Sequence, residues 1–425
     1  MIDILLGLQW GDEGKGKIVD VLAPDYQVVA RFQGGPNAGH TLEFNGNKHV
    51  LHQIPSGIFR ADCLNIIGNG VVLDPITFKK EIEGLGKYNL DLKNNLVISK
   101  KTAIIIPTHR LLDAAYEKAK GDAKIGSTLK GIGPAYSDKV ARQGLRLGDI
   151  ISPNFLTKYN DLVKKHQQIL DFYQFEYDLV SAEKEFFEAV EFIKAFSLED
   201  TEYVVNYAIN SGQKVLAEGA QGSLLDIDFG SYPFVTSSNT TAAGVCSGLG
   251  VAPNKVGEVY GIFKAYCTRV GSGPFPTELH DDLGELIRQE GREFGSTTGR
   301  PRRTGWLDLP ALKYSIMLNG VTQLIMMKVD VLNILDEVKV CTHYKLPDGS
   351  LTEQMPYDLT DTTVEPVYKV FNGWKCSLEN MHTFDQIPQE LSDYITYLEE
   401  TLNVPISFIS TGPDREAVIL REAVK

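Results

Sequence analysis

The N-terminal segment has the pattern of a strand, a glycine-rich loop and a helix, and this order restricts the chain to α/β folds. Residues 2–8 (IDILLGL) form an apolar run long enough for a buried strand, and residues 17–23 (KIVDVLA) have helical character. The loop between them, GDEGKGK at 11–17, has the G-x-x-x-x-G-K spacing of a phosphate-binding loop. Such a loop places its backbone N–H groups and the following helix N-terminus around an anion.

The variable positions of this loop are unusual for a phosphate site. Ile18 replaces the Ser or Thr whose hydroxyl normally holds Mg²⁺, and two carboxylates, Asp12 and Glu13, stand where anions should bind. Glycines still open the backbone to an anion, and Lys15 and Lys17 supply mobile positive charge. Two interpretations stay open: a turn with solvated charges, or a phosphate loop in which a carboxylate stands where the phosphate arrives.

Further apolar runs follow, and they are continuous where a half-exposed strand would alternate. Continuous runs suit strands covered on both faces, as in a parallel sheet. We therefore expect an α/β fold with a large, mostly parallel central sheet flanked by helices, similar to phosphate-loop NTPases, with a helical subdomain. The runs lie at 27–32, 64–73, 95–99, 103–107, 213–219, 256–263, 322–332 and 405–411.

Two long segments between these runs have helical periodicity. Apolar residues recur at three- and four-residue steps within 155–173 and 182–196, which predicts a mainly helical insert at about 150–212. No repeat, low-complexity tract or flexible linker interrupts the chain. We therefore expect residues 1–425 to form one large α/β domain that carries this insert.

The charge balance and the cysteines limit the kinds of partner. A net charge of −13 argues against a nucleic-acid or anionic-membrane binder, because phosphate backbones require a surplus of Lys and Arg. Five scattered cysteines without a C-x-x-C pair indicate reduced thiols, not a disulfide framework or a zinc site. We see no secretory signal or membrane helix and expect a cytoplasmic protein.

A second glycine-rich loop follows the second apolar run. In RFQGGPNAGHTLEF (31–44), glycines open the backbone, and Asn37 and His40 offer polar side chains beside it. A lone His is more often structural than catalytic. Two such loops after the first two strands nevertheless indicate one site at the carboxyl ends of parallel strands.

Four later segments add binding chemistry. Lys328 and Asp330 follow an apolar run with the spacing K-x-D. In nucleotide-binding proteins this spacing is typical of guanine recognition, because the Asp carboxylate accepts hydrogen bonds from the ring N–H and the amino group of guanine. The STGP stretch at 410–413 is a plausible second wall for a base. The basic loop at 296–306 is either a solvated charge run or a clamp for carboxylates and phosphates. The polar loop at 218–241 is typical of a ligand-contact surface.

The motifs together resemble one family over essentially the whole chain. The resemblance is to adenylosuccinate synthetases and runs from about residue 4 to about residue 421. It implies a ligase that makes adenylosuccinate from IMP and L-aspartate with GTP and Mg²⁺, the first committed step of AMP synthesis from IMP. The motifs that carry it, in order, are QWGDEGKGKIVD, QGGPNAGHT, STLKGIGPAY, EGAQGSLLDID, YPFVTSSNTT, STTGRPRRTGW, MKVD and ISTGPDR.

The resemblance also implies roles for individual residues. Asp12 would be the general base that removes the N1 proton of IMP, and would bind Mg²⁺ with the Gly39 carbonyl. His40 would be the general acid beside the β- and γ-phosphates of GTP, and Lys15 would hold the phosphates in line. Gln221 would complete the catalytic set. A carboxylate is therefore expected in this loop, and the missing Ser or Thr is dispensable.

The binding residues implied by the resemblance fall into three groups. For GTP they are Gly11, Asp12, Glu13, Gly14, Lys15, Gly16, Lys17, Gly39, His40, Thr41, Arg302, Lys328, Val329, Asp330, Ser410, Thr411 and Gly412. For IMP they are Asp12, Glu13, Gly14, Lys15, Asn37, Ala38, Gly39, His40, Thr128, Gln221, Thr236 and Arg300, with Arg142 supplied across a homodimer. For aspartate they are Ser296, Thr297, Thr298, Gly299, Arg300 and Arg302.

Two other functions fit part of the pattern. A GTP-binding switch would explain the phosphate loop and K-x-D, but it needs a Ser or Thr at position 18 and leaves Asp12 and His40 without a purpose. A pseudoenzyme that binds purine nucleotides without turnover would not need the intact set of polar residues. Pro36 and Pro301 depart from the family pattern, and both would stiffen their loops.

Overall fold

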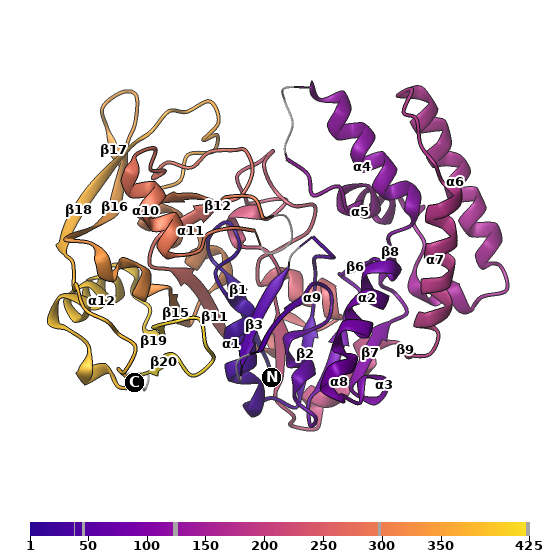
Figure 1. Ribbon diagram of the computed structural model, residues 1–425, viewed down its shortest axis with the longest axis horizontal. Helices are drawn as coiled ribbons and strands as arrows, with labels where there is room; N and C mark the ends of the chain where they lie inside the picture. Colours follow the sequence, from indigo (N-terminus) through magenta and orange to yellow (C-terminus); the bar gives the residue numbers. More distant parts are fainter. Residues whose placement is uncertain (38, 45–46, 122–125, 296–298, 422–425) are drawn as a thin grey trace.

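The computed structural model describes residues 1–421 except 38, 45–46, 122–125 and 296–298. Its centre is a ten-stranded sheet in which every neighbouring pair is parallel except β19 and β20 (Figure 1). This confirms the expected α/β fold with a large, mostly parallel sheet. In spatial order the strands are β20 (Val418–Leu420), β19 (Ile406–Ser410), β15 (Gln323–Met327), β11 (Val256–Lys264), β1 (Ile2–Gly7), β10 (Val215–Glu218), β2 (Val28–Arg31), β5 (Leu64–Ile67), β7 (Leu96–Ser99) and β9 (Ser197–Glu199).

The strands of this parallel sheet are apolar on both faces, because both faces of the sheet are covered. Every residue of β2, β7 and β10 is buried, and so are five of the six residues of β1. Side chains that alternate between the two faces are thus covered by helices on both sides. The continuous apolar runs in the sequence reflect this double burial.

The strand order reverses near the middle of the sheet. From β1 the chain adds β2, β5, β7 and β9 on one side and then inserts β10 between β1 and β2. It continues with β11, β15 and β19 on the other side of β1. Loops that leave the carboxyl ends of β1, β10 and β2 therefore diverge, and such a divergence is where α/β proteins bind ligands.

The helices pack on the sheet and extend one end of the molecule. In Figure 1, α4, α5, α6 and α7 stand together at the end opposite the C-terminal strands. The range 150–212 contains α6, α7 and α8, and also β9 at the sheet edge. The helices are α1 (Lys15–Leu22), α2 (Pro75–Leu85), α3 (Leu92–Asn95), α4 (Pro107–Ala119), α5 (Ile132–Ala141), α6 (Phe155–Phe172), α7 (Val180–Ile193), α8 (Thr201–Asn210), α9 (Ala243–Leu249), α10 (Asp282–Glu290), α11 (Leu309–Asn319) and α12 (Gln389–Leu402).

Smaller sheets lie outside the central one. The apolar run at 64–73 divides, because β5 enters the central sheet while β6 (Val72–Leu73) pairs with β8 (Ala103–Ile104). No helix in the described residues is long and apolar enough to cross a membrane. The other strands are β3 (His40–Phe44) paired with β4 (Asn47–Leu51), β12 (Cys267–Arg269) with β13 (Arg303–Gly305), and β14 (Leu307–Asp308), β16 (Glu337–Lys345), β17 (Leu351–Thr352) and β18 (Glu365–Asn372) in one sheet.

Candidate active site

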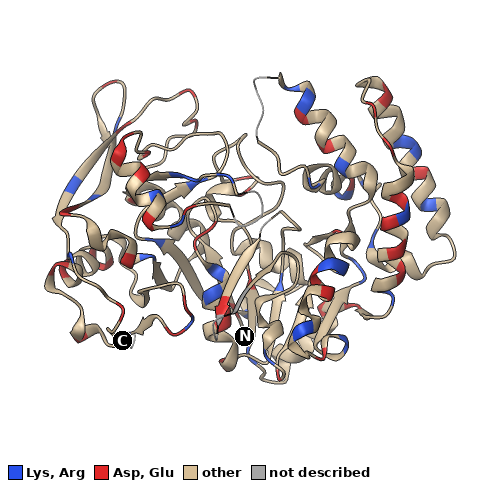
Figure 2. Ribbon diagram, viewed as in Figure 1, with Lys and Arg blue, Asp and Glu red and all other residues tan. Residues whose placement is uncertain are grey.

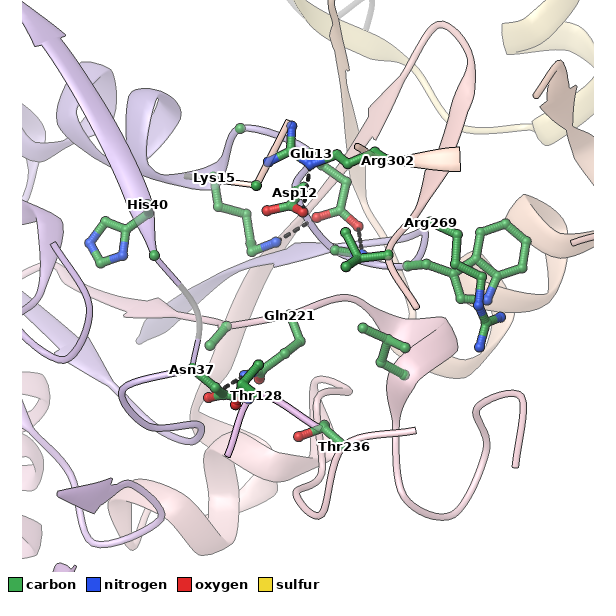
Figure 3. A pocket seen from close by; sticks show the side chains of 18 of the residues that line it. Asp12, Glu13, Lys15, Asn37, His40, Thr128, Gln221, Thr236, Arg269 and Arg302 are labelled. Atoms are coloured by element: carbon green, nitrogen blue, oxygen red, sulfur yellow. Dashed lines mark hydrogen bonds and ion pairs between the residues drawn. The ribbon is translucent and has the colours of Figure 1, made fainter. Parts of the chain in front are cut away.

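A cavity of about 1000 Å³ opens at the carboxyl ends of the central strands. It collects residues from both glycine-rich loops and the polar loop (Figure 3), and also from the K-x-D segment and the STGP stretch. The residues expected from the sequence that line it are Gly11, Asp12, Glu13, Gly14, Lys15, Gly16, Lys17, Asn37, Gly39, His40, Thr41, Thr128, Gln221, Thr236, Arg302, Lys328, Asp330, Ser410 and Gly412.

The two adjacent acids of the first loop have opposite surroundings. Glu13 is 1% exposed, and its Oε1 accepts the backbone N–H groups of Gln9 at 3.1 Å and Gly11 at 2.9 Å, while Oε2 pairs with Lys15. Positive φ angles at Gly11 (86°) and Asp12 (61°) turn the Asp12 side chain the other way, and it is 31% exposed. The loop interior thus holds one carboxylate and the cavity receives the other.

Asp12 pairs with an arginine from the basic loop. Arg302 Nε lies 2.9 Å from Asp12 Oδ2, and Arg302 Nη1 donates to Glu293 Oε2 at 2.6 Å (Figure 3 shows the first contact). The sequence analysis did not identify Glu293, which lies beyond α10 in a segment without a recognisable motif. The sequence feature that could have identified Glu293 is its position three residues before the basic loop, where a carboxylate can pair with the arginines.

His40 lies beside the first helix because that helix begins with a glycine-rich turn. A Cβ on Gly16 would come 3.2 Å from His40 Cδ2, so only glycine leaves the ring its space. His40 Nε2 is 3.7 Å from Glu218 Oε1, and Arg31 Nη1 is also 3.7 Å from that oxygen. Burial raises the pKa of the Glu218 carboxyl, while Arg31 and Ser56 oppose the rise.

Glu218 and Arg31 were not identified from the sequence. Each is the last residue of a buried strand, β10 and β2, which are neighbours in the sheet. The sequence feature that could have identified them is a charged residue at the carboxyl end of an apolar run. The carboxyl ends of parallel strands are where α/β proteins form their binding sites.

Hydrogen bonds join the second loop to the polar loop at the cavity. Gln221 Nε2 donates to Asn37 Oδ1 at 3.2 Å, and Thr128 and Thr236 line the cavity nearby (Figure 3). Among the described residues, Gln221 Oε1 is buried without a hydrogen-bond partner. A buried acceptor left unpaired is costly, so a ligand that donates an N–H here would be bound favourably.

The K-x-D segment forms the far end of the cavity. Lys328 (φ 62°) precedes a short 3₁₀ helix, Val329–Ile334, so that Asp330 lies at its start. Burial raises the pKa of the Asp330 carboxyl, and the charges of Lys328 and Lys17 oppose the rise. The carboxylate therefore lies in a pocket that is partly shielded from water. There, a ligand that donates hydrogen bonds to the carboxylate is strongly favoured over one that cannot.

Lys17 connects the first helix to the second wall of this pocket. Its ammonium donates to Ser410 Oγ at 2.8 Å and to the carbonyl oxygens of Gly412 at 2.8 Å and Ala417 at 2.9 Å. The expectation of a mobile positive charge is wrong for Lys17, because all three ammonium protons are engaged. Burial lowers the pKa of Lys17 to about 8, while Asp330 and Asp414 act in the opposite direction.

Some expected residues lie away from the cavity wall. Arg142 ends α5 with a φ of 63°, is exposed and is absent from the cavity lining, as are exposed Gly299 and Arg300. Val329 and Thr411 are buried next to lining residues. Ala38, Ser296, Thr297 and Thr298 fall outside the described residues.

Comparisons with known proteins agree over the whole chain. Residues 4–419 match the family model described as adenylosuccinate synthetase. The chain is 62% identical to the adenylosuccinate synthetase of Cytophaga hutchinsonii, over 99% of this chain and 98% of the relative. It is 60% identical to that of Flavobacterium johnsoniae, over 99% and 100%.

Solved structures give the same result. The fully ligated adenylosuccinate synthetase from Plasmodium falciparum superposes with a TM-score of 0.93 at 39% identity, covering 99% of both chains. A cyanophage succinoaminodeoxyadenylate synthetase shares the fold, with a TM-score of 0.61 at 19% identity over 99% of this chain and 95% of its own. By sequence and by structure, this chain belongs to the adenylosuccinate synthetase family.

Proposed function

We propose that the chain joins IMP to L-aspartate at the expense of GTP, giving adenylosuccinate, GDP and phosphate. This is the reaction of a GTP-dependent carbon–nitrogen ligase in AMP biosynthesis, and the family membership supports it. The observation that carries the proposal is the position of Asp12. Its carboxylate emerges from a phosphate-type loop into a cavity that also contains Gln221 and Asp330.

The chemistry follows from that position. Asp12 takes the N1 proton of IMP, the freed electron pair moves toward O6, and O6 attacks the γ-phosphorus of GTP. The bond from phosphorus to the bridging oxygen breaks, GDP leaves and 6-phosphoryl-IMP forms. The amine of aspartate then adds at C6, loses a proton, and phosphate leaves with the C6–O bond.

The phosphate loop and His40 act on the charge that develops on GTP. Lys15 and the loop N–H groups would hold the phosphates in line, because they face an anion from several sides. His40 lies against Gly16 at the start of α1 and would donate to the developing oxyanion between the β- and γ-phosphates. The Glu13 carboxylate keeps the loop open by accepting its inward N–H groups.

The donor atoms at Asp12 suit a magnesium ion. Mg²⁺ prefers hard oxygen ligands, and Asp12 Oδ atoms and the Gly39 carbonyl oxygen would supply them. The Asp12 carboxylate already attracts a cation, because it pairs with Arg302 at 2.9 Å. When bound, the metal would neutralise charge on the phosphates. Since no serine or threonine stands at position 18, Asp12 takes over the role of the missing hydroxyl.

The remaining contacts divide among the substrates. Asn37, Thr128, Gln221 and Thr236 would hold IMP, and the unpaired Gln221 Oε1 supports this because it would accept a ligand N–H. Asp330 would read the guanine ring of GTP with Ser410 and Gly412, and Val329 and Thr411 would support them from behind. Residues 296–302, which include Arg300 and Arg302, would close on aspartate.

The proposal also covers the oligomeric state of the protein and its place in the cell. Arg142 is exposed at the end of α5 and is absent from the cavity lining of its own chain, which supports a homodimer in which it reaches the partner's IMP. The five cysteines are free thiols, as expected for a cytoplasmic protein. We also propose that residues 1–425 form one domain with a mainly helical insert at about 150–212.

An ultraviolet assay tests the reaction and the choice of nucleotide together. Purine absorbance is followed with IMP, aspartate and Mg²⁺, and GTP is compared with ATP as phosphoryl donor. We expect a spectral change that requires both aspartate and GTP. Turnover with ATP alone would contradict the guanine-reading role of Asp330. GTP hydrolysis that ignores IMP would instead favour a GTP-binding switch.

A further inference from the structure

A buried carboxylate behind the cavity holds a cluster of positive charges together. Glu293 is 0% exposed, and its Oε1 accepts the Tyr266 hydroxyl at 2.5 Å and pairs with Lys264 at 3.2 Å and Lys328 at 3.5 Å. Its Oε2 accepts Arg302 Nη1 at 2.6 Å. We call these five residues, Glu293, Tyr266, Lys264, Lys328 and Arg302, the Glu293 cluster.

The charges of the cluster hold this carboxylate ionised although it is buried. Burial alone would raise the pKa of Glu293, but Lys264, Lys328 and Arg302 outweigh it and hold the pKa below its usual range. Lys264 is also 0% exposed, and burial lowers its pKa while Glu293 opposes the change. A buried charge is tolerated only with such partners, so the two residues depend on each other.

Glu293 also closes the base of the basic loop. The Arg302 backbone N–H donates to the Glu293 carbonyl at 2.8 Å, and Gly295 N–H donates to the Arg300 carbonyl at 2.9 Å. Phe294 and Pro301 form an antiparallel bridge between these two contacts. Glu293 and Arg302 are therefore joined twice, through backbone and side chain, at the base of the basic loop.

The same arginine joins Glu293 to the phosphate loop. One guanidinium is shared between Glu293 at 2.6 Å and Asp12 at 2.9 Å, while Lys328 of the K-x-D segment contacts Glu293 and the Gly291 carbonyl. The cluster thus connects three parts of the cavity: the loop assigned to aspartate, the catalytic carboxylate and the guanine pocket. A ligand that engages Asp12 competes with Arg302 for this carboxylate, and Glu293 is the group that would then retain the arginine at the cavity wall.

We propose that Glu293 is a positioning residue for aspartate, because it fixes the Arg302 guanidinium and the base of the 294–301 loop in the geometry that receives this substrate. The inference rests on the proposed function, since that function assigns the loop to aspartate. Glu293 does not itself line the cavity, so it acts through Arg302.

The substitution Glu293→Asp tests the geometry without removing the charge. The shortened side chain cannot reach Arg302 and Lys264 together, although the charge of the cluster is unchanged. We expect the KM for aspartate to rise by about tenfold or more, with a smaller change in kcat and in the KM for IMP, because small misplacements of a positioning group are costly. Steady-state kinetics with each substrate varied in turn measures this split.

A second variant separates positioning from charge balance. Lys264→Met combined with Glu293→Gln removes the buried ion pair as a whole, which proteins often tolerate. We expect it to fold, as judged by its melting temperature, and still to show the raised KM for aspartate. A wild-type KM for aspartate in this double variant, or in Glu293→Asp, would overturn the proposal.

Asp308→Asn is the matched control. Asp308 is another buried carboxylate, and it accepts the Tyr344 hydroxyl and the Ala311 N–H away from the cavity. Its loss should lower the melting temperature and leave the KM for aspartate unchanged. Wild-type protein that makes no adenylosuccinate would refute the proposed function itself, an outcome distinct from failure of the Glu293 variants.

Discussion

At the scale of single residues, Asp12 and Glu13 are adjacent acids with different tasks. Positive φ at Asp12 points one carboxylate into the cavity, and the other fills the inside of the loop. From the sequence, the resemblance singled out Asp12, whereas nothing in the residue types predicts which acid faces inward. Glu218, Arg31 and Glu293 carry only weak signals in the sequence, and residue type alone does not reveal which groups they contact.

The first prediction concerns the general base. Asp12→Asn keeps the size and much of the polarity of the side chain but cannot take the N1 proton of IMP. We expect kcat to fall by a factor of about 10² to 10⁴, the usual contribution of a general base. Binding of GTP, measured by calorimetry, should change little, because Lys15 and the loop N–H groups remain. A kcat near that of the wild type would exclude Asp12 as the base.

The second prediction concerns the space beside His40. In Gly16→Ala, the new Cβ would lie 3.2 Å from His40 Cδ2, so the ring must shift. We expect kcat to fall about tenfold or more, because a proton donor displaced by a fraction of an ångström loses its alignment. Stopped assays of product formation at saturating substrates measure the change.

Gly84→Ala is the matched control for that variant. Gly84 also lies in a helix, α2, and its added Cβ would meet no atom closer than 3.7 Å. Alanine in a helix interior is more favourable than glycine by about 1 kcal/mol. The control should therefore melt at a higher temperature with an unchanged kcat. Equal rates for the Gly16 and Gly84 variants would show that the position of His40 is not critical.

At the scale of secondary-structure elements, the strands of the central sheet were largely predictable and their partners were not. Runs such as 256–263 and 405–411 became β11 and β19 because burial on both faces requires an apolar sequence. The insertion of β10 between β1 and β2 depends on contacts between residues that lie about two hundred positions apart in the sequence. No local sequence pattern indicates such contacts. The pairing of β16 with β18 is closer in sequence, but it passes over β17, which no local pattern indicates either.

A buried cluster joins three helices at the end that carries Arg142. His109 Nε2 lies 3.0 Å and His166 Nε2 lies 2.8 Å from Asp138 Oδ2, which connects α4, α5 and α6. The His109 Nδ1 atom accepts the Ile106 N–H at 3.0 Å, so the neutral ring carries its proton on Nε2. No lone pair of His109 is then left for a metal, and the three side chains form a hydrogen-bonded clamp.

The third prediction is the pH dependence of this clamp. Burial lowers the pKa of His109 from its usual 6.5, opposed by Asp138, and the two histidines hold the pKa of Asp138 below its usual range against the effect of burial. Protons therefore bind the unfolded chain more readily, and stability is lost as pH falls. We expect the free energy of unfolding to decrease from about pH 6.5 downward, measured by urea denaturation across a pH series.

Two substitutions identify the group responsible. His109→Asn removes the buried imidazole and should reduce the slope of the pH dependence between about pH 6.5 and 5, whatever its cost in overall stability; His49 and His52, whose pKa values burial also lowers, account for the remaining slope. His280→Asn alters a histidine whose side chain is 81% exposed and should leave the dependence as in the wild type. If the two variants gave the same slope, the clamp would not be the origin of the effect.

At the scale of the whole molecule, an acidic protein binds three anionic substrates. Acidic residues are spread along helices at both ends of the molecule (Figure 2), while Lys15, Lys17, Arg302 and Lys328 gather at one cavity. The surface thus repels anions in general, and the cavity attracts them locally. With a net charge of −13, anionic ligands require such a local concentration of basic residues.

The fourth prediction tests whether the site is shared between two chains. Arg142 lies outside the cavity of its own chain, and Asp12 lies inside it. In a homodimer that exchanges Arg142, the variants Arg142→Ala and Asp12→Asn would each be inactive as pure dimers. Mixed after subunit exchange, they would form heterodimers in which one site combines the intact Asp12 of one chain with the intact Arg142 of the other.

The size of the recovered activity distinguishes this arrangement from others. Random mixing of equal amounts makes half of the dimers heterodimers, and each has one complete site of two, so about a quarter of the wild-type activity should return. Mixing Asp12→Asn with His40→Asn provides the control. If both residues act within one chain, each heterodimer site contains one of the two defects and activity should stay absent. No recovery in the first mixture, with dimers present by sedimentation, would show that Arg142 does not complete the partner's site.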